Sequence, residues 1–260
     1  MNKLIASFFL LMTSLTYGVV YESMDIADVE KHVDQDTLLI FDLDNTIMEP
    51  KQQLGTDQWF YYTIQRRIKQ GMDKTEALEE TLSHWMALQN ITEVQLCQEG
   101  CQQVIAQLQE KNIPIMGLTT RGLGLSQCTI RQLKSLGVDL SKTAPSQSEH
   151  FALNPRSVLY RGGILFTAGT NKGTAFEKII KDMGYTVRKV VFINDKRSHI
   201  TELEVRVEEM GIPFVGLRYG VTDERVKNFS MELADIQEEH FQNIMSDEKA
   251  EEILMQRKSS

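Results

Sequence analysis

The chain has 260 residues, of which 42% are hydrophobic and 25% are charged, as in an ordinary soluble globular protein. This length fits one large domain, or one domain that carries an insertion. The formal net charge of −8 disfavours binding to nucleic acid over a broad surface. We therefore expect no nucleic-acid partner.

The first 18 residues have the pattern of a secretory signal peptide. Lys3 precedes an apolar stretch from Leu4 to Leu15, and small and polar residues lead to Gly18, the predicted cleavage point. The stretch is too short for a membrane-spanning helix, which needs about 20 residues; the alternative is a first buried strand or helix. We predict an exported protein, periplasmic or secreted, with no membrane attachment after the signal is removed.

Further along the chain, short apolar runs alternate with helical patterns. Runs rich in Ile, Val, Leu and Phe predict strands buried on both faces, and they cover residues 37–41, 113–118, 187–193 and 212–217. The helical patterns each end at a glycine and cover residues 126–137, 172–184 and 198–211. This alternation predicts an α/β fold with a doubly wound, Rossmann-like parallel sheet.

Two regions interrupt the alternation. Residues 47–110 carry no convincing strand, and residues 56–71 and 72–89 have helical periodicity. We predict a small helical cap inserted after the first strand at 50–95, and an α/β core made of 19–49 and 96–260. The second region is expected to contain a hairpin that turns at Gly162-Gly163, and residues 230–257 are expected to form a packing helix. The three cysteines, Cys97, Cys101 and Cys128, are predicted to be buried thiols.

Polar residues follow the predicted strands where each strand ends, the edge at which open α/β sheets bind ligands. They are Asp42 with Asp44, then Thr119, then Asn194 with Asp195. Carboxylates clustered without a cation would repel each other. Oxygen ligands suit Mg²⁺, which bridges to phosphate, and the lysine at 172 together with a hydroxyl group suits the remaining phosphate oxygens. The pattern therefore predicts phosphoryl chemistry with Mg²⁺ as cofactor and a small phosphorylated substrate.

The stretch "FDLDNT" at 41–46 resembles the first motif of the haloacid dehalogenase-like (HAD) superfamily, an apolar strand followed by D-x-D-x-T. The resemblance implies that Asp42 is the nucleophile that forms an aspartyl-phosphate, and that Asp44 is the general acid/base. It also implies that Thr119 hydrogen-bonds the phosphoryl group and that Lys172 neutralises the charges of nucleophile and phosphate. Asp195 matches the metal-binding carboxylate of the fourth motif.

By this resemblance the catalytic residues are Asp42, Asp44 and Lys172. The metal ligands are Asp42, Asp195 and the backbone carbonyl of Asp44. Thr120 and Arg121, which follow Thr119, complete the expected substrate-binding set of Thr119, Thr120 and Arg121. Thr46 is expected to hold the loop rather than to react.

The sequence departs from the common family pattern at its fourth motif. Asn194 stands where many relatives have Asp, and Ser198 and His199 stand where a further Asp or Asn is common. Only two side-chain carboxylates are left as expected metal ligands, so metal affinity is expected to be modest. His199 is either an orienting partner of Asp195 or a solvated residue at a helix start.

The resemblance predicts a phosphatase that hydrolyses small phosphomonoesters. Two alternatives stay open: a phosphotransferase that uses the same intermediate, and a catalytically weak HAD-fold binding protein. The predicted cap carries four aromatic residues and two arginines that either contact substrate or form the core of the cap itself. They are Trp59, Phe60, Tyr61, Tyr62, Arg66 and Arg67.

Overall fold

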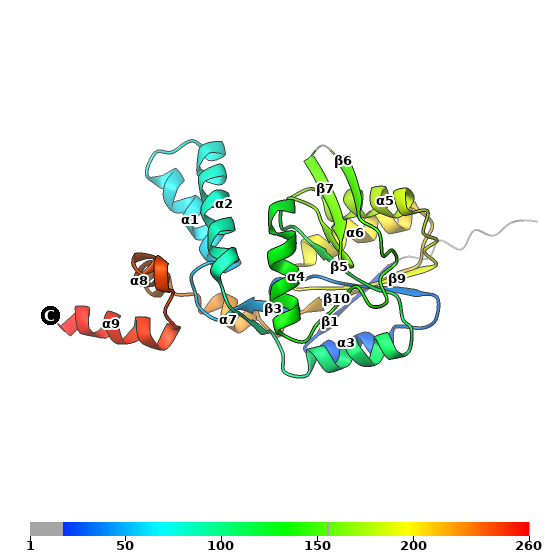
Figure 1. Cartoon of the computed structure of the whole chain (residues 1–260), viewed down its shortest axis with the longest axis horizontal. Helices are drawn as coiled ribbons and strands as arrows, with labels where there is room; N and C mark the ends of the chain where they lie inside the picture. Colours follow the sequence, from blue (N-terminus) through cyan, green and yellow to red (C-terminus); the bar gives the residue numbers. More distant parts are fainter. Residues whose placement is uncertain (1–17, 155, 260) are drawn as a thin grey trace, which may run out of the picture.

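A computed structural model describes residues 18–154 and 156–259. Within these residues eight strands form one sheet in the order β1-β10-β9-β2-β5-β8-β7-β6 (Figure 1). The strands are β1 (Val19–Ser23), β2 (Thr37–Phe41), β5 (Ile115–Thr119), β6 (His150–Asn154), β7 (Arg156–Arg161), β8 (Ile164–Phe166), β9 (Lys189–Asn194) and β10 (Phe214–Tyr219). In this order, the strands from β1 as far as β8 pair in parallel. Strand β7 pairs antiparallel with β8, and β6 pairs antiparallel with β7.

The sheet is buried on both faces because alternate side chains of each strand point to opposite sides. Leu39 and Phe41 of β2 belong to one apolar cluster, together with side chains from η1 (Ile26–Lys31), α3 (Cys101–Glu110) and α4 (Ser126–Ser135). Leu38 and Ile40 belong to a second cluster, with side chains from α5 (Lys172–Met183) and α6 (Arg197–Glu209). Helices therefore cover both faces, and the predicted doubly wound α/β fold is confirmed.

Several local predictions are also confirmed. Helix α5 ends at Gly184 in the left-handed conformation (φ 63°), which a residue without Cβ adopts at no cost. The chain turns from β7 to β8 at Gly162-Gly163, with Arg161 paired to Ile164. The three cysteines of the described chain are free thiols, buried or half-buried.

The structure corrects the prediction that 47–110 contains no strand. Strands β3 (Met48–Pro50) and β4 (Val94–Leu96) pair antiparallel as a separate small sheet. Each has three residues, too few for an alternating pattern to be recognised in the sequence. The insertion was expected after the first strand, but β1 precedes β2 and pairs with β10 at the edge of the main sheet. The helical insertion therefore follows β2 and β3 rather than the first strand.

Two helices, α1 (Asp57–Lys69) and α2 (Lys74–Ile91), lie between β3 and β4 and form a helical hairpin (Figure 1). Both match the helical patterns expected there. Thr56 caps α1 and Asp73 caps α2, each by accepting a bond from a backbone N–H of the first turn. The small β3–β4 sheet connects this hairpin to the core, while the exact division of the chain into core and cap stays a prediction.

Residues 230–257 were expected to form one helix, but the structure divides the C-terminal region into several. They are α7 (Asp223–Lys227), α8 (Met231–Glu239), η3 (Phe241–Asn243) and α9 (Asp247–Ser259). After the break, Asp247 at the start of α9 accepts hydrogen bonds from the backbone and side chain of Gln53. Helix α8 packs against α1, where Arg66 pairs with Asp235 and Glu238. The end of the chain therefore supports the hairpin (Figure 1).

Candidate active site

The polar residues predicted at strand ends meet at the centre of the sheet. Strand β2 lies between β5 and β9, so Asp42, Thr119 and Asn194 stand at the carboxyl ends of three adjacent strands. The backbone N–H of Asp42 continues the ladder by donating to the carbonyl of Ile193 at 3.0 Å. Lys172, the first residue of α5, reaches the same edge from the loop that follows β8. The predicted convergence of these side chains is therefore a property of the fold.

Asp42 and Lys172 form a buried ion pair. Lys172 Nζ lies 2.6 Å from Asp42 Oδ1 and also donates to the Leu118 carbonyl at 3.0 Å. The side chain of Lys172 is 0% exposed and that of Asp42 is 8% exposed. The next residue, Gly173, lets the start of α5 approach α6, because a Cβ there would lie 2.1 Å from the Glu202 carbonyl oxygen. This close packing holds the lysine against the carboxylate, so that both buried charges are compensated.

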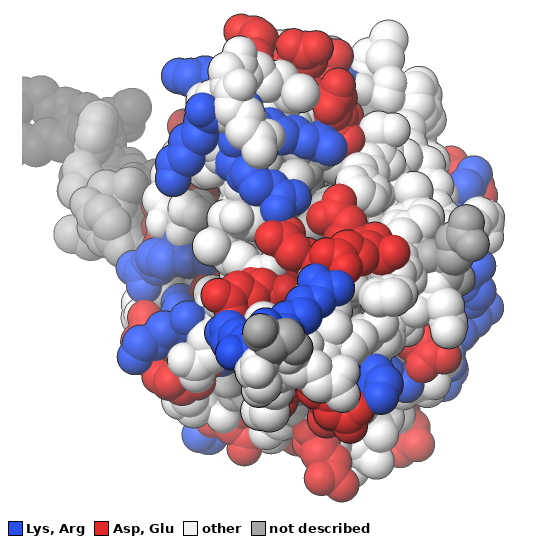
Figure 2. All heavy atoms as spheres, turned by 90° about the vertical axis from the view of Figure 1, so that its left-hand side faces the viewer, with Lys and Arg blue, Asp and Glu red and all other residues white. Residues whose placement is uncertain are grey.

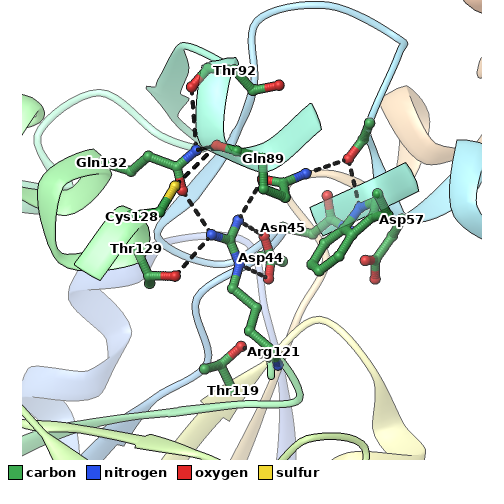
Figure 3. Close-up of polar contacts among 12 residues, drawn as sticks. Asp44, Asn45, Asp57, Gln89, Thr92, Thr119, Arg121, Cys128, Thr129 and Gln132 are labelled. Carbon is green, nitrogen blue, oxygen red and sulfur yellow. Dashed lines mark hydrogen bonds and ion pairs between the residues drawn. The ribbon is translucent and has the colours of Figure 1, made fainter. Parts of the chain in front are cut away.

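Asp44 faces a different cation. Both of its carboxylate oxygens accept bonds from Arg121, at 2.9 Å from Nε and 2.7 Å from Nη2 (Figure 3). Arg121 donates its other N–H groups to Thr129 at 3.0 Å, Gln132 at 2.7 Å and Gln89 at 3.1 Å. All five guanidinium donors are thus engaged within the protein, and a contact between Arg121 and phosphate, as expected from the sequence, would require one of these bonds to break.

Asp195 has the surroundings of a cation ligand. Its Oδ1 is buried without a hydrogen-bond partner, and its Oδ2 accepts a 3.4 Å bond from Asn45. Burial and the neighbouring charge of Asp42 raise the pKa of Asp195 to about 8. A divalent cation between the two carboxylates would satisfy the unpartnered oxygen and remove this penalty. The donor set fits Mg²⁺, although the described residues include no group of three or more His, Cys, Asp or Glu side chains suited to a metal.

The structure shows the surroundings of Asn194 and His199, whose roles the sequence left open. Asn194 is fully buried, and its Oδ1 accepts a 2.7 Å bond from the backbone N–H of Lys196, so it shapes the loop that carries Asp195. His199 is half-buried rather than solvated, and its Nδ1 has no hydrogen-bond partner. Burial, together with the charge of Lys172, lowers the pKa of His199 to about 4, so the ring is neutral at physiological pH.

The two threonines after β5 differ. Thr119 is buried, and its hydroxyl accepts a 3.2 Å bond from the backbone N–H of Arg121, which leaves the hydroxyl hydrogen available to a ligand. Thr120 is exposed and lines a cavity beside Asp44. Thr46 was expected to hold the loop, but its buried hydroxyl has no hydrogen-bond partner, and the loop is instead closed by backbone bonds to the Leu43 carbonyl.

A cavity of about 720 Å³ opens between the helical hairpin and the strand ends, and Asp44, Arg121 and His199 lie in its wall. Its apolar side is built by one face of the hairpin, from Phe60, Leu78, Leu82, Trp85 and Met86. Its wall also carries Arg156 of β7, which donates to the Ala168 carbonyl at 3.4 Å and forms no ion pair within the part of the chain that the structure describes.

Only part of the aromatic and basic group expected in the cap faces this cavity. Phe60 and Tyr61 line it, whereas Trp59 is fully buried in the core of the hairpin. Tyr62 packs near Phe229 and under Arg66, which pairs with α8. Arg67 donates to Thr81 of α2. The two arginines therefore hold helices together.

Sequence reasoning missed the residues that connect the hairpin to the site. Gln89 and Gln132 are buried in the Arg121 network, but a glutamine on an amphipathic helix carries no signal that separates it from a surface residue. Lys196 pairs with Asp57 at 2.5 Å and lies over the ring of Tyr61. Asp57 is the first residue of α1, where an acidic residue is favoured by the helix dipole alone. The contacts of Gln89 with Arg121 and of Asp57 with Lys196 join segments far apart in the chain.

The chain belongs to the family described as "Protein of unknown function (DUF2608)", whose model matches residues 22–251. Among similar proteins, a "Putative outer membrane protein" of Chlamydia pneumoniae is 24% identical over 241 residues, 93% of this chain and 91% of that protein. A protein of Chlamydia trachomatis with the same description is 21% identical and covers 87% of this chain and 85% of its own. An uncharacterised protein of Rickettsia prowazekii is 22% identical over 78% of this chain and 76% of its own.

Among solved structures, a haloacid dehalogenase-like hydrolase from Streptococcus pneumoniae has a TM-score of 0.41 and 12% identity, over 69% of this chain and 93% of its own. A phosphoserine phosphatase, solved as a phospho-aspartyl intermediate analogue, has a TM-score of 0.37 and 12% identity, over 76% of this chain and 100% of its own.

Proposed function

We propose that this protein is a Mg²⁺-dependent phosphatase of small phosphomonoesters that works through an aspartyl-phosphate on Asp42. The observation that carries the proposal is the buried pair of Asp42 and Lys172 at the carboxyl end of the central strand. Asp44 stands two residues further on, and the unpartnered oxygen of Asp195 lies at the same edge. The ordered motifs of the HAD superfamily agree with this assignment.

In the first half of the proposed reaction, a carboxylate oxygen of Asp42 attacks phosphorus. The bond from phosphorus to the ester oxygen breaks, and that oxygen takes a proton from Asp44. In the second half, a water molecule gives a proton to Asp44 and its oxygen attacks the phosphorus of the acyl-phosphate. Inorganic phosphate leaves and the carboxylate of Asp42 is restored.

The charges of the site support this course. Lys172 offsets the charge of Asp42 before reaction and that of the phosphoryl group afterwards, and Thr119 supplies a hydroxyl hydrogen to a phosphoryl oxygen. Asp42, Asp195 and the backbone carbonyl of Asp44 would hold Mg²⁺, which supplies positive charge to the phosphoryl oxygens when bound. Such placed charge is the main source of rate enhancement in phosphoryl transfer.

The cavity supports a substrate with an apolar organic part. Phe60, Leu82 and Trp85 would cover an aromatic or aliphatic group, because burying such surface contributes roughly 25 cal/mol per Å². Arg156 would pair with a second anionic group at the far end. The proposed substrate class is therefore a phosphomonoester of an apolar alcohol or phenol, with a carboxylate or second phosphate remote from the ester.

The proposal includes export to the periplasm or beyond the cell. The predicted signal peptide supports it, although residues 1–17 lie outside the described residues, and the Chlamydia relatives carry outer-membrane descriptions. No helix within 18–154 or 156–259 is long and apolar enough to cross a membrane. Figure 2 shows acidic and basic side chains interspersed over the face that carries the hairpin and the C-terminal helices, which supports a small-molecule substrate rather than nucleic acid.

The proposal is tested with p-nitrophenyl phosphate as substrate. We expect hydrolysis that requires Mg²⁺ and stops with EDTA, and we expect Asp42→Asn to abolish it while circular dichroism shows an unchanged fold. Asp36→Asn, which alters an exposed carboxylate, is the matched control and keeps full activity. Full activity of Asp42→Asn would refute the mechanism. Glycerol added as acceptor distinguishes hydrolysis from phosphotransfer, because transfer would yield glycerol phosphate.

A further inference from the structure

Arg121 lies at the centre of a buried polar network beside Asp44 (Figure 3). The whole residue is 2% exposed, and all five of its N–H donors are bonded within the protein. A bidentate guanidinium–carboxylate pair fixes both the position and the plane of the carboxylate. Arg121 therefore determines where the carboxylate of Asp44 points.

The other partners of Arg121 come from two different parts of the fold. Thr129 and Gln132 belong to α4 of the core and hold Nη1. Gln89 belongs to α2 of the helical hairpin and holds the second N–H of Nη2. The guanidinium is thus anchored to the core on one side, while the hairpin completes its set of partners on the other side.

Gln89 also connects Arg121 with the point at which the chain enters the hairpin. Its side-chain amide donates to the Gly55 carbonyl at 2.7 Å, and Trp85 donates to the same oxygen at 2.9 Å. Gly55 has φ +84°, a left-handed conformation that favours glycine. It directly precedes Thr56, the residue that caps α1, where a change of backbone angle would rotate the hairpin.

The exit from the hairpin joins the same network. Gln132 donates from Nε2 to the carbonyls of Gln89 at 3.1 Å and Thr92 at 3.2 Å, while its Oε1 accepts from Arg121. The entry to the hairpin at Gly55 and its exit at Thr92 are therefore each linked, through one glutamine, to the guanidinium that binds Asp44. A movement of α2 away from the core breaks the bond between Gln89 and Arg121 and leaves a buried donor unpaired, which costs free energy.

We propose that Arg121 is a positioning residue that orients Asp44 for proton transfer, and that Gln89 makes this orientation depend on the position of the helical hairpin. The inference rests on the proposed function, since it takes Asp44 as the residue that exchanges protons with the leaving group and with water. With the hairpin seated as in this structure, Gln89 completes the Arg121 network, which fixes the carboxylate of Asp44. Proton transfer by Asp44 thereby depends on the position of the hairpin.

The test compares two esters that differ in their need for a proton. The p-nitrophenolate group leaves without protonation, whereas the alkoxide of benzyl phosphate requires it. We expect Arg121→Met to lower kcat/KM for benzyl phosphate about 10²-fold more than for p-nitrophenyl phosphate, the lower range of a general-acid contribution. Arg121→Lys keeps the charge without the fork and should show a smaller but still selective loss.

Gln89→Met tests the coupling to the hairpin. We expect a selective loss for benzyl phosphate of about tenfold, since Arg121 keeps its core partners and Asp44 loses only part of its restraint. The matched control is Arg131→Met, because Arg131 also joins α4 to the hairpin by donating to the Asn90 carbonyl at 2.6 Å but does not contact Asp44. This substitution should change kcat/KM for the two esters by the same factor.

A double-mutant comparison separates positioning from a purely structural effect. In an Asp44→Asn background, Arg121→Met should cause no further selective loss, because the residue that it positions is already absent. Equal losses for both esters in Arg121→Lys and Gln89→Met would overturn the inference while the proposed function stands. A wild-type protein that hydrolyses neither ester would overturn the proposed function and the inference together. If Arg121→Met does not fold, the Arg121→Lys and Gln89→Met results decide.

Discussion

Lys172→Met is expected to affect stability as well as activity. The Lys172 side chain is fully buried, and its partner Asp42 is 8% exposed with an Nζ–Oδ1 distance of 2.6 Å. Removing one member of such a pair leaves an uncompensated buried charge, which costs about 3–5 kcal/mol. At about 2–4 °C per kcal/mol for a chain of this size, the melting temperature should fall by about 6–20 °C. Activity toward p-nitrophenyl phosphate should be lost.

The measurement is urea denaturation at pH 7 in the presence of EDTA, for Lys172→Met, Asp42→Asn and the double variant. In the Asp42→Asn background the lysine substitution should cost about 2 kcal/mol less than in the wild type, because no carboxylate is left unpaired. Additive effects, with a coupling below about 0.5 kcal/mol, would refute the claim that the pair carries compensated buried charges. Lys178→Met, which alters an exposed lysine of the same helix, is the control and should change stability little.

Three further predictions concern the end of β9, the loop after it and the first turn of α6. Asp195→Asn should raise the Mg²⁺ concentration for half-maximal activity at least tenfold, and an unchanged Mg²⁺ titration would exclude this residue as a ligand. Asn194→Asp should tighten Mg²⁺ binding, measured by isothermal titration; unchanged binding would place this side chain outside the reach of the metal. His199 has its pKa lowered to about 4 by burial and the charge of Lys172, so between pH 6.5 and 4 the unfolded chain binds a proton that the native chain does not. His199 therefore contributes up to about 1.4 kcal/mol of stability per pH unit that is lost as the pH is lowered through this window, while Asp195, whose pKa is raised to about 8, contributes in the opposite direction. In urea denaturation, His199→Gln should gain stability relative to the wild type as the pH is lowered from 6.5 to 4. A difference between variant and wild type that does not change with pH would contradict this reasoning.

The helical hairpin shows why some of the fold was predictable and some was not. Its two helices follow from periodicity over 13 and 18 residues, long enough for the pattern to be clear. Strands β3 and β4, which join the hairpin to the core, have three residues each and depend on pairing with each other. The C-terminal helices likewise make a remote contact that no local pattern indicates, between Asp247 and Gln53.

The candidate site divides in the same way. Asp42 and Thr119 were recognisable because each stands at the end of an apolar strand, and Lys172 because it begins a helix. All three occur in the order of the HAD motifs. The Asp44 network was not recognisable, because Arg121 lies 77 positions after Asp44, and Gln89, which bonds Arg121, lies 32 positions before it. Arg121 was expected to face the phosphate, yet the fold surrounds it with acceptors from α2 and α4.

By itself, the sequence determined the alternation of strands and helices and the residues at the strand ends, because hydrophobic periodicity and strand direction are local properties. The resemblance to the HAD motifs already implied that Lys172 compensates Asp42, and the structure brings the two side chains within 2.6 Å. Only the tertiary structure decided the partner of Asp44, which meets Arg121 from the loop after β5. No local pattern indicates this partner, because the two residues lie 77 positions apart and approach each other only when the sheet places β5 beside β2.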